Sequence, residues 1–321
     1  MSVFSRILYA VKSTDPRHES GLVKVARLAR SCDAQLELFH AISTPLFLPE
    51  RVGDESIADL KRDTLELHIL RLEKLAARAR RLGLKVSCSA AWDYPPHEAI
   101  LRRAADIGAN LIVAQCHVGK GSGRLMRLTD WELLKTSAIP VLLLHSSTPY
   151  RRPAVLAAVD PGHAHGKPAD LDGSILANGR AIAAALGGRL HVVHANQPPL
   201  LGIAYETPFT VEDLWTHGRK TFEKFMARQD IAPRCRHLVD GDPSRVVPRV
   251  ARETGAKIVV MGAVSRSGLK RLFIGNTAER LLSRLTADVL VVRPAQFHSR
   301  VSRRPRNALI LLPTPASAFT A

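Results

Sequence analysis

The chain of 321 residues carries one short stretch twice: Gly108-Ala109-Asn110-Leu111-Ile112-Val113 and, 147 positions later, Gly255-Ala256-Lys257-Ile258-Val259-Val260. Two further pairs of apolar runs are 148 positions apart, namely 7–11 with 155–159 and 139–144 with 287–292. Collinear matches at a nearly constant separation indicate an internal duplication. The segment 146–153, rich in Ser, Thr, Pro and Arg, is expected to link the two copies.

Each copy alternates short apolar runs with amphipathic stretches of helical length. Strands are expected at 7–11, 36–42, 85–90, 110–115 and 140–144, and again at 155–159, 190–195, 234–239, 257–262 and 288–292. Helices are expected at 18–32, 57–82, 96–107 and 129–137, and again at 170–186, 211–228, 243–254 and 276–285. Continuous Val, Ile and Leu runs are typical of parallel strands buried on both faces. The sequence therefore predicts an α/β protein of two tandem, doubly wound domains, each with a five-stranded parallel sheet.

The predicted domains are 1–147 and 153–295, followed by a basic tail, 296–321, that we expect to be disordered. Four isolated cysteines without a Cys-x-x-Cys pair argue against a disulfide framework and against a structural zinc site. No apolar run reaches the ~18 residues of a membrane span, and the N-terminus has no secretory cleavage pattern. We therefore expect a cytoplasmic protein with no membrane span and no bound metal. Its net charge of +17 favours encounters with anionic partners.

The segment after the fourth strand of the C-terminal copy is the candidate ligand site, because doubly wound sheets bind ligands beyond the carboxyl ends of their strands. It runs from Gly262 to Glu279 and ends at the start of a predicted helix. Glycines let backbone amides approach an anion, and a helix N-terminus attracts negative charge. The segment is therefore a candidate cradle for the phosphates of a nucleotide. The alternative is that Asn276 and Glu279 only cap the helix.

This segment resembles the phosphate loop of the universal stress protein family, whose nucleotide-binding members have G-x-x-G, nine residues, then G-[ST]. Gly262, Ser265 and Gly275-Asn276 stand at those positions. The Gly-Asn-Thr-Ala-Glu form, with Thr129-Asp130-Trp131 in the N-terminal copy, is similar to the tandem, universal stress protein E-like type of two fused domains. The resemblance covers about residues 4–294. It implies the fold shared with the adenine-nucleotide alpha hydrolases, and a stress-response or regulatory protein that is no enzyme beyond very slow ATP hydrolysis.

The same resemblance implies a set of ligand contacts in the C-terminal copy. Asp160 is expected to hold the nucleoside, and Ala195 to lie beside the adenine. The phosphates of ATP, or of a related adenine nucleotide, would be held by backbone amides at Gly262, Ser265, Arg266, Gly275 and Asn276 and by the Thr277 hydroxyl. Ser265 replaces the family's second glycine, and a left-handed backbone there would cost about 1 kcal/mol. Asn276 replaces the family's hydroxyl residue, although its amide can still donate.

The N-terminal copy has lost most of this pattern. Lys12 stands at the aspartate position, Gln115 and Val118 replace the first two loop glycines, and Leu128 replaces the third. We therefore expect this copy to be a structural or dimerising partner that does not bind ATP in the family manner. The expected partners are an adenine nucleotide, the other copy within the chain, and a second chain in a homodimer. Nucleic acid, bound through the basic tail, is a less favoured partner.

A second hypothesis from a different class stays open. In it the chain is an interaction module that binds no nucleotide and acts through protein partners or anionic surfaces. His40 and His194, at equivalent ends of the second strands, are interpreted as core histidines rather than as catalytic bases. His163 and His165 lack a clustered carboxylate or cysteine and are not interpreted as metal ligands.

Overall fold

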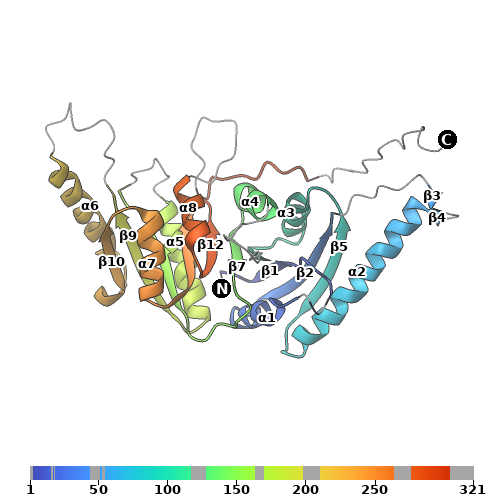
Figure 1. Ribbon diagram of the computed structural model, residues 1–321. Coiled ribbons are helices and arrows are strands. Elements are labelled where there is room, and N and C mark those ends of the chain that lie inside the picture. The colour runs from blue at the N-terminus through green and yellow to red at the C-terminus, as the bar shows by residue number, and fades with distance from the viewer. Residues whose placement is uncertain are drawn as a thin grey trace, which may run out of the picture.

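The computed structural model describes residues 3–15, 17, 19–43, 51–52, 55–116, 128–162, 170–197, 210–263 and 276–303. The two copies share one continuous sheet (Figure 1) with the strand order β10-β9-β8-β11-β12-β7-β6-β1-β2-β5. Within each copy the spatial order is third, second, first, fourth and fifth strand, and every pair is parallel. This is a doubly wound arrangement, so the predicted fold class is confirmed.

The boundaries of the elements follow the predicted ones to within a few residues. The N-terminal copy contains β1 (Arg6–Ala10), α1 (Leu22–Ser31), β2 (Gln35–Ile42), α2 (Ile57–Arg80), β5 (Val86–Trp92), α3 (Pro96–Asp106), β6 (Leu111–Gln115), α4 (Leu128–Thr136) and β7 (Val141–Leu144). The C-terminal copy contains β8 (Ala154–Ala158), α5 (Leu171–Ala185), β9 (Arg189–Asn196), α6 (Val211–Met226), β10 (Arg236–Asp240), α7 (Pro243–Glu253), β11 (Ala256–Gly262), α8 (Asn276–Arg284) and β12 (Asp288–Val292). Three short elements were not predicted: β3 (Arg51–Val52), β4 (Glu55–Ser56) and the 3-10 turn η1 (Pro233–Cys235).

Helices cover both faces of the sheet. One apolar layer contains buried residues of α1, α2, α5 and α6, and the other contains buried residues of α3, α4, α7 and α8. Strand residues alternate between these layers; Ile7 of β1, for example, belongs to the first and Leu8 to the second. Both layers extend across the two copies, which explains why the strand sequences are apolar throughout rather than alternating with polar residues.

The two copies join where β7 and β12 pair antiparallel, with Leu142 opposite Leu290. All other strand pairs in this sheet are parallel, so strand direction reverses only at this junction. The carboxyl ends of the N-terminal strands therefore lie at one edge of the sheet and those of the C-terminal strands at the other. Ligand sites at these ends would be separate and would face away from each other.

A buried charged network connects the copies beside this junction. The Lys24 ammonium of α1 is paired with the Asp288 carboxylate of β12, and their side chains are 3% and 1% exposed. Tyr150 donates its hydroxyl to Asp288 Oδ2 (2.5 Å), and its ring centroid lies 4.3 Å from Lys24 Nζ. Asp288 Oδ1 also accepts the backbone N–H of His145 at 2.7 Å, and Lys24 donates to the Ser146 carbonyl at 2.9 Å. Burial, followed by the Asp288 charge, raises the pKa of Tyr150 well above its ordinary value.

Arg293, directly after β12, forms a second buried connection between the copies. Its guanidinium donates to the carbonyl of Ala263 (3.0 Å), and to those of Leu134 (2.7 Å) and Lys135 (3.0 Å). The last two carbonyls belong to the final turn of α4, where a cation is stabilised by the helix dipole. Burial lowers the pKa of Arg293 to about 10. The residue thus connects the end of β11 to a helix of the other copy.

The tail that was expected from Gln296 onward is described as far as Arg303. Gln296 Nε2 donates to Asp170 Oδ2 at 3.1 Å. The Ser302 carbonyl accepts a hydrogen bond of 3.2 Å from Arg102 of α3. This part of the tail therefore contacts both copies, and residues 304–321 lie outside the described residues.

Candidate functional site

Three of the predicted site residues lie at one edge of the sheet, at the ends of three neighbouring strands. Asp160 follows β8, which lies between β9, containing Ala195, and β11, ending at Gly262. The N–H of Val159 donates to the Val193 carbonyl at 3.0 Å, which continues the β8–β9 pairing up to Asp160. The doubly wound strand order therefore brings together residues that are far apart in the sequence, at the topological switch point where such sheets bind ligands.

The turn at Asp160 is anchored to the start of α5. The backbone N–H of Asp160 donates to Asp172 Oδ1 at 3.0 Å. Asp172 is in the first turn of α5 and is 1% exposed, a position where the helix dipole stabilises a carboxylate. Asp160 itself is half-buried. The backbone that carries the predicted nucleoside contact is therefore held by the helix that follows it.

Gly262 has a packing role that the sequence did not reveal. A Cβ atom added here would lie 2.6 Å from Leu171 Cδ2 and 3.2 Å from Ile175 Cδ1, both on α5. The buried leucine occupies the space that any side chain at position 262 would need. A side chain at this position would therefore require Leu171 to move, whether or not a phosphate lies nearby.

Most of the predicted phosphate segment lies outside the described residues. Ser265, Arg266 and Gly275 lie outside the described residues, and so does the side chain of Asn276. Helix α8 begins at Asn276, as predicted, with Thr277 half-buried in its first turn. The structure thus provides a helix N-terminus, which is favourable for an anion, close in sequence to Gly262 at the strand end.

The register between the two copies is set by the buried residues of α4 and α8. The matching buried pairs are Leu133 with Leu281 and Leu134 with Leu282. This separation of 148 places Thr129 opposite Thr277 and Asp130 opposite Ala278. Leu128 therefore stands opposite Asn276 rather than opposite Gly275, which corrects the alignment made from the sequence.

The equivalent place in the N-terminal copy is a cavity of about 130 Å³. It lies between the carboxyl ends of β1, β2 and β6 and the first turns of α3 and α4. Its lining includes Lys12, Ala41 and Thr129, which stand opposite Asp160, Ala195 and Thr277 of the C-terminal copy. Positions that the family resemblance assigns to ligand contact therefore surround a single cavity in this fold.

An ion pair spans this N-terminal cavity. Lys12 Nζ lies 2.9 Å from Asp130 Oδ1 and 3.0 Å from Asp130 Oδ2, with side chains 23% and 2% exposed. The C-terminal copy has Asp160 and Ala278 at these two positions, so both charges have changed together. Asp130 was not among the residues predicted from the sequence. The sequence indicates its importance only when the two copies are aligned with a separation of 148, because Lys12 and Asp130 then both differ in charge from their counterparts Asp160 and Ala278.

The two equivalent histidines each bond to a backbone carbonyl; His194 is a buried core residue, as interpreted from the sequence, whereas His40 is half-buried and lines the N-terminal cavity. His194 is 4% exposed, and its Nδ1 bonds to the Val159 carbonyl at 3.1 Å; His40 Nδ1 bonds to the Val11 carbonyl at 2.8 Å. Because a carbonyl only accepts, Nδ1 carries the proton in both. Desolvation lowers the pKa of His40. Each ring faces an aromatic ring of the long helix, His68 at 4.7 Å in α2 for His40 and Phe222 at 5.7 Å in α6 for His194.

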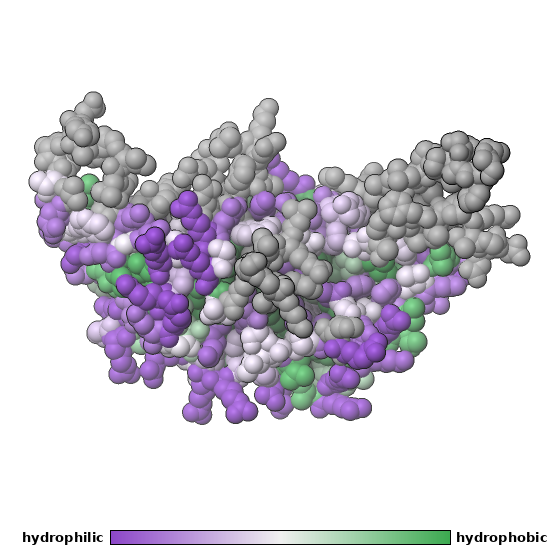
Figure 2. All heavy atoms as spheres, viewed as in Figure 1, coloured by the Kyte–Doolittle hydropathy of each residue, from purple (hydrophilic) through white to green (hydrophobic). Residues whose placement is uncertain are grey.

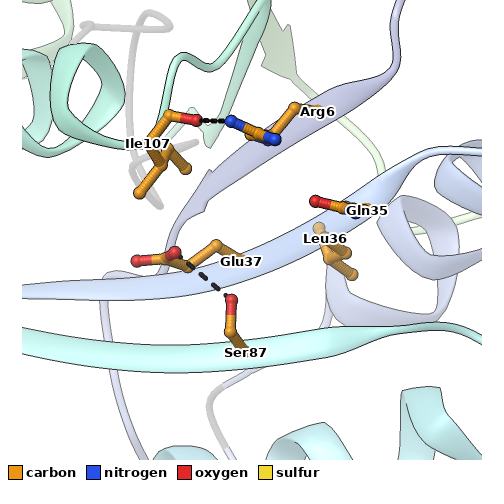
Figure 3. Close-up of a pocket in the computed structure, with 6 residues that line it drawn as sticks. All are labelled: Arg6, Gln35, Leu36, Glu37, Ser87 and Ile107. Atoms are coloured by element: carbon orange, nitrogen blue, oxygen red, sulfur yellow. Dashed lines mark hydrogen bonds between the residues drawn. The ribbon is translucent and has the colours of Figure 1, made fainter.

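A second cavity, of about 180 Å³, lies at the opposite edge of the N-terminal copy, near the amino ends of its strands (Figure 3). Arg6 and Glu37 point toward it from neighbouring strands. Arg6 donates to the Ile107 carbonyl, and Glu37 accepts from Ser87 (3.2 Å) and from Arg103 (2.6 Å). The charged groups are thus engaged within the protein, and this is not the edge at which doubly wound sheets bind ligands.

Three further features bear on the kinds of site that the fold offers. Within the described ranges, no group of three or more His, Cys, Asp or Glu residues is placed to hold a metal ion. No helix in that part of the chain is both long and apolar enough to cross a membrane. All four cysteines have free thiols.

One family model and two relatives show what this sequence is similar to. The model of the universal stress protein family matches residues 4–145 and 155–293. Universal stress protein E of Photorhabdus laumondii is 26% identical over 223 residues, 67% of this chain and 71% of the relative. A universal stress protein E homolog of Haemophilus influenzae is 22% identical over 301 residues, 89% and 92% of the two chains.

Solved structures extend the similarity to the arrangement of both copies. A functionally unknown protein of Pseudomonas aeruginosa PAO1 superposes with a TM-score of 0.70 at 27% identity, covering 91% of this chain and 93% of that one. A universal stress protein of Archaeoglobus fulgidus has a TM-score of 0.62 at 16% identity over 90% of this chain and 98% of that one, which shows a shared fold.

Proposed function

The chain belongs to the universal stress protein family, and from that premise we propose that its C-terminal copy binds ATP or a related adenine nucleotide while its N-terminal copy does not. The protein then acts in the cytoplasm as a stress-response or regulatory protein. Its output is a nucleotide-dependent state rather than a reaction product, with at most very slow hydrolysis of the bound ATP.

The observation that carries this proposal is the paired exchange of charges between the two copies. The C-terminal copy keeps a carboxylate, Asp160, at the strand end and has the neutral Ala278 in the first turn of α8. The N-terminal copy has Lys12 and Asp130 instead, paired across the cavity at 2.9 Å. The Asp130 carboxylate neutralises the Lys12 ammonium and, at the start of α4, opposes the attraction of the helix N-terminus for a phosphate. The asymmetry therefore favours one nucleotide per chain.

In this proposal each predicted residue has a distinct role. Asp160 binds the nucleoside, and Ala195 lies beside the adenine. The groups proposed to bind the phosphates are the backbone amides of Gly262, Ser265, Arg266, Gly275 and Asn276 and the hydroxyl of Thr277. Small changes at Asp160 should therefore weaken binding without altering the fold, because Asp160 is only half-buried.

A second candidate function is an interaction module that binds no nucleotide. The observation that favours it is the packing of Leu171 against Gly262, since a Cβ at position 262 would lie 2.6 Å from that side chain. Glycine at this position also fits the packing of Leu171, so its presence is not by itself a sign of a ligand. The two candidates differ in one measurable respect, which is whether an adenine nucleotide binds at all.

Isothermal titration of the full chain with ATP separates the two candidates. Asp160→Asn and Lys12→Met form a matched pair, because they change equivalent positions in the two copies. ATP should release heat with the wild type. Asp160→Asn should weaken binding by at least about tenfold, the loss of one hydrogen bond to a charged group. Lys12→Met should bind as the wild type does.

Two results would contradict the proposal. The absence of heat at high protein concentration would leave the interaction module as the better account. A loss of ATP affinity in Lys12→Met, with no loss in Asp160→Asn, would place the nucleotide in the N-terminal copy instead of the C-terminal one. Far-ultraviolet circular dichroism of both variants serves as the control that their folds are intact.

A further inference from the structure

The outer face of α2 exposes apolar residues that the fold itself does not need. Leu67 and Leu70 are 45% and 55% exposed, whereas Leu72 and Leu75, on the other side of the same helix, are completely buried. Helix α2 lies at one end of the sheet, on the flank of the molecule (Figure 1). Figure 2 shows hydrophobic side chains on this flank among hydrophilic ones.

The C-terminal copy provides an internal comparison. Its equivalent helix, α6, aligns with α2 through the buried pair Leu72 and Met226, a separation of 154. In this register Thr221 stands at the position of Leu67, and Lys224 at that of Leu70. The same fold thus forms with a polar outer face in one copy. The exposed leucines of α2 are therefore a property of the N-terminal copy alone, which calls for an explanation outside the fold.

The outer face of α2 also has the spacing of a helix–helix seam. Leu60, Asp63, Leu67, Leu70, Lys74 and Ala77 follow one another at alternating steps of three and four residues. This is the a and d pattern of a coiled coil, which aligns residues in one stripe along the helix. Asp63 has 59% of its side chain exposed, and Lys74 and Ala77 are exposed too.

We propose that this seam binds the same seam of a second chain, antiparallel, about a twofold axis between positions 68 and 69. In that register Leu67 packs against the partner's Leu70, and Asp63 lies opposite the partner's Lys74. Leu60 faces the partner's Ala77. Each layer occurs twice, as a twofold axis requires. The stripe is therefore self-complementary in both shape and charge, and a second copy of this chain is the occupant that fits it.

Charge complementarity is what selects this partner. In the antiparallel register the acidic Asp63 meets a basic residue, and the only two charges in the stripe neutralise each other. A parallel pairing would place Asp63 beside the partner's Asp63 and Lys74 beside the partner's Lys74, which is repulsive. A different protein would have to reproduce this order of charges. The inference does not depend on nucleotide binding, because α2 forms no part of the lining of the N-terminal cavity.

The size of the seam limits the strength of the dimer. Residues 60–77 of a helix span about 27 Å, so the contact is smaller than a standard interface of roughly 1,600 Å². The dimer should therefore be weak, with a dissociation constant in the micromolar range, and it should be sensitive to salt because each chain contributes a charged layer.

Sedimentation velocity of the full chain over the micromolar range tests the proposal. The wild type should shift from monomer to dimer as its concentration rises. Leu67→Glu with Leu70→Glu should raise the dissociation constant by at least about a hundredfold, since it removes both leucine layers and gathers like charges at the axis. The matched control is Thr221→Glu with Lys224→Glu in α6, which should dimerise as the wild type does.

Charge exchange tests the register itself. Asp63→Lys and Lys74→Asp should each weaken the dimer by about tenfold, and the two together should restore it to within about threefold of the wild type. A wild type that stays monomeric throughout the range would overturn the proposal. The proposal would also be overturned if the dimer persisted in Leu67→Glu with Leu70→Glu. The same holds if Asp63→Lys with Lys74→Asp dimerised no more tightly than either single variant. All substituted residues are exposed except Thr221, which is half-buried, and circular dichroism checks that each variant is folded.

Discussion

Replacing Asp288 by asparagine should strongly destabilise both copies of the chain. Asp288 of β12 is paired with Lys24 of α1, and the two side chains are 1% and 3% exposed. Asparagine keeps the size of the side chain and removes its charge. The ammonium of Lys24 would then stay buried between the copies without its counter-ion.

The expected magnitude follows from the burial of the pair. Removing one partner of a buried ion pair costs about 3–5 kcal/mol, because an uncompensated charge stays in a poorly solvated place. Lys24 would keep two other contacts, the Ser146 carbonyl at 2.9 Å and the Tyr150 ring at 4.3 Å. These contacts favour the lower end of that range. We therefore expect Asp288→Asn to lower the free energy of unfolding by about 3 kcal/mol.

Urea unfolding, followed separately in each copy, measures this effect. The N-terminal copy contains Trp92 and Trp131, and the C-terminal copy contains Trp215, so single-tryptophan variants report on one copy at a time. In the wild-type background the two transitions should coincide, because the copies share both apolar layers. Asp288→Asn should shift both transitions to lower urea concentration.

A double-mutant cycle and a surface control complete the test. Lys24→Met combined with Asp288→Asn should recover part of the loss, with a coupling of about 1–3 kcal/mol. The exposed pair Arg249 and Glu253, 3.7 Å apart with side chains 52% and 62% exposed, is the control. Glu253→Gln should change stability by less than about 0.5 kcal/mol. A loss below about 1 kcal/mol for Asp288→Asn would refute the reasoning, because it would mean that the buried charge is readily solvated.

Three further outcomes are expected. Gly262→Ala should lower the free energy of unfolding, measured in urea titrations, by about 1–3 kcal/mol, because the added Cβ overlaps Leu171. In a chain that already carries Leu171→Ala, the loss caused by Gly262→Ala should be smaller. Equal stability of Gly262→Ala and the wild type would contradict this prediction. Stability should fall as pH drops below about 6.5, because the unfolded chain then binds more protons than the folded one. The histidines whose pKa burial lowers are His40, His68, His191 and His237. His191→Asn with His237→Asn should reduce the slope of stability against pH, and an unchanged slope would exclude these groups as its source. Gly218→Ala should weaken the packing of α6, because the added Cβ would overlap Asn196 Oδ1. Hydrogen exchange of the α6 backbone amides should then be faster than in the wild type. Unchanged exchange rates would refute this prediction.

Much of the fold follows from local patterns in the sequence. The repeated apolar runs predict the strands well, since a strand buried on both faces must be apolar throughout. The run at 190–195, for example, becomes β9 (Arg189–Asn196). Helix α2 (Ile57–Arg80) falls within the predicted span 57–82 because its amphipathic pattern is long. These features depend on neighbouring residues alone.

The junction between the copies depends on residues far apart in the sequence. Nothing in the run Val141–Leu144 indicates that β12, rather than solvent or a second chain, lies beside it. The pairing of Lys24 with Asp288 joins opposite ends of the chain, and neither residue differs locally from an ordinary surface charge. The only hint is that Asp288 replaces Pro140 of the other copy in an otherwise apolar strand.

The candidate site was predicted only in part, because some of its contacts also join residues that are far apart in the sequence. Asp160, Ala195 and Gly262 were predicted as ligand contacts from strand order and family resemblance, and the structure brings them to neighbouring strand ends. Asp130 was missed because its meaning depends on Lys12, which is distant in sequence and 2.9 Å away in space. The packing of Leu171 on Gly262 was missed because a glycine gives no local sign of the side chain that occupies its space.

Counting nucleotides per chain tests the central claim most directly. Native mass spectrometry of the full protein under saturating ATP gives this number without any assumption about the site. The account predicts one nucleotide per saturated wild-type chain, and an ATP concentration at least about tenfold higher for half-occupancy of Asp160→Asn. Two nucleotides per chain would show that Lys12 and Asp130 do not close the N-terminal copy, and no nucleotide at all would remove the C-terminal site.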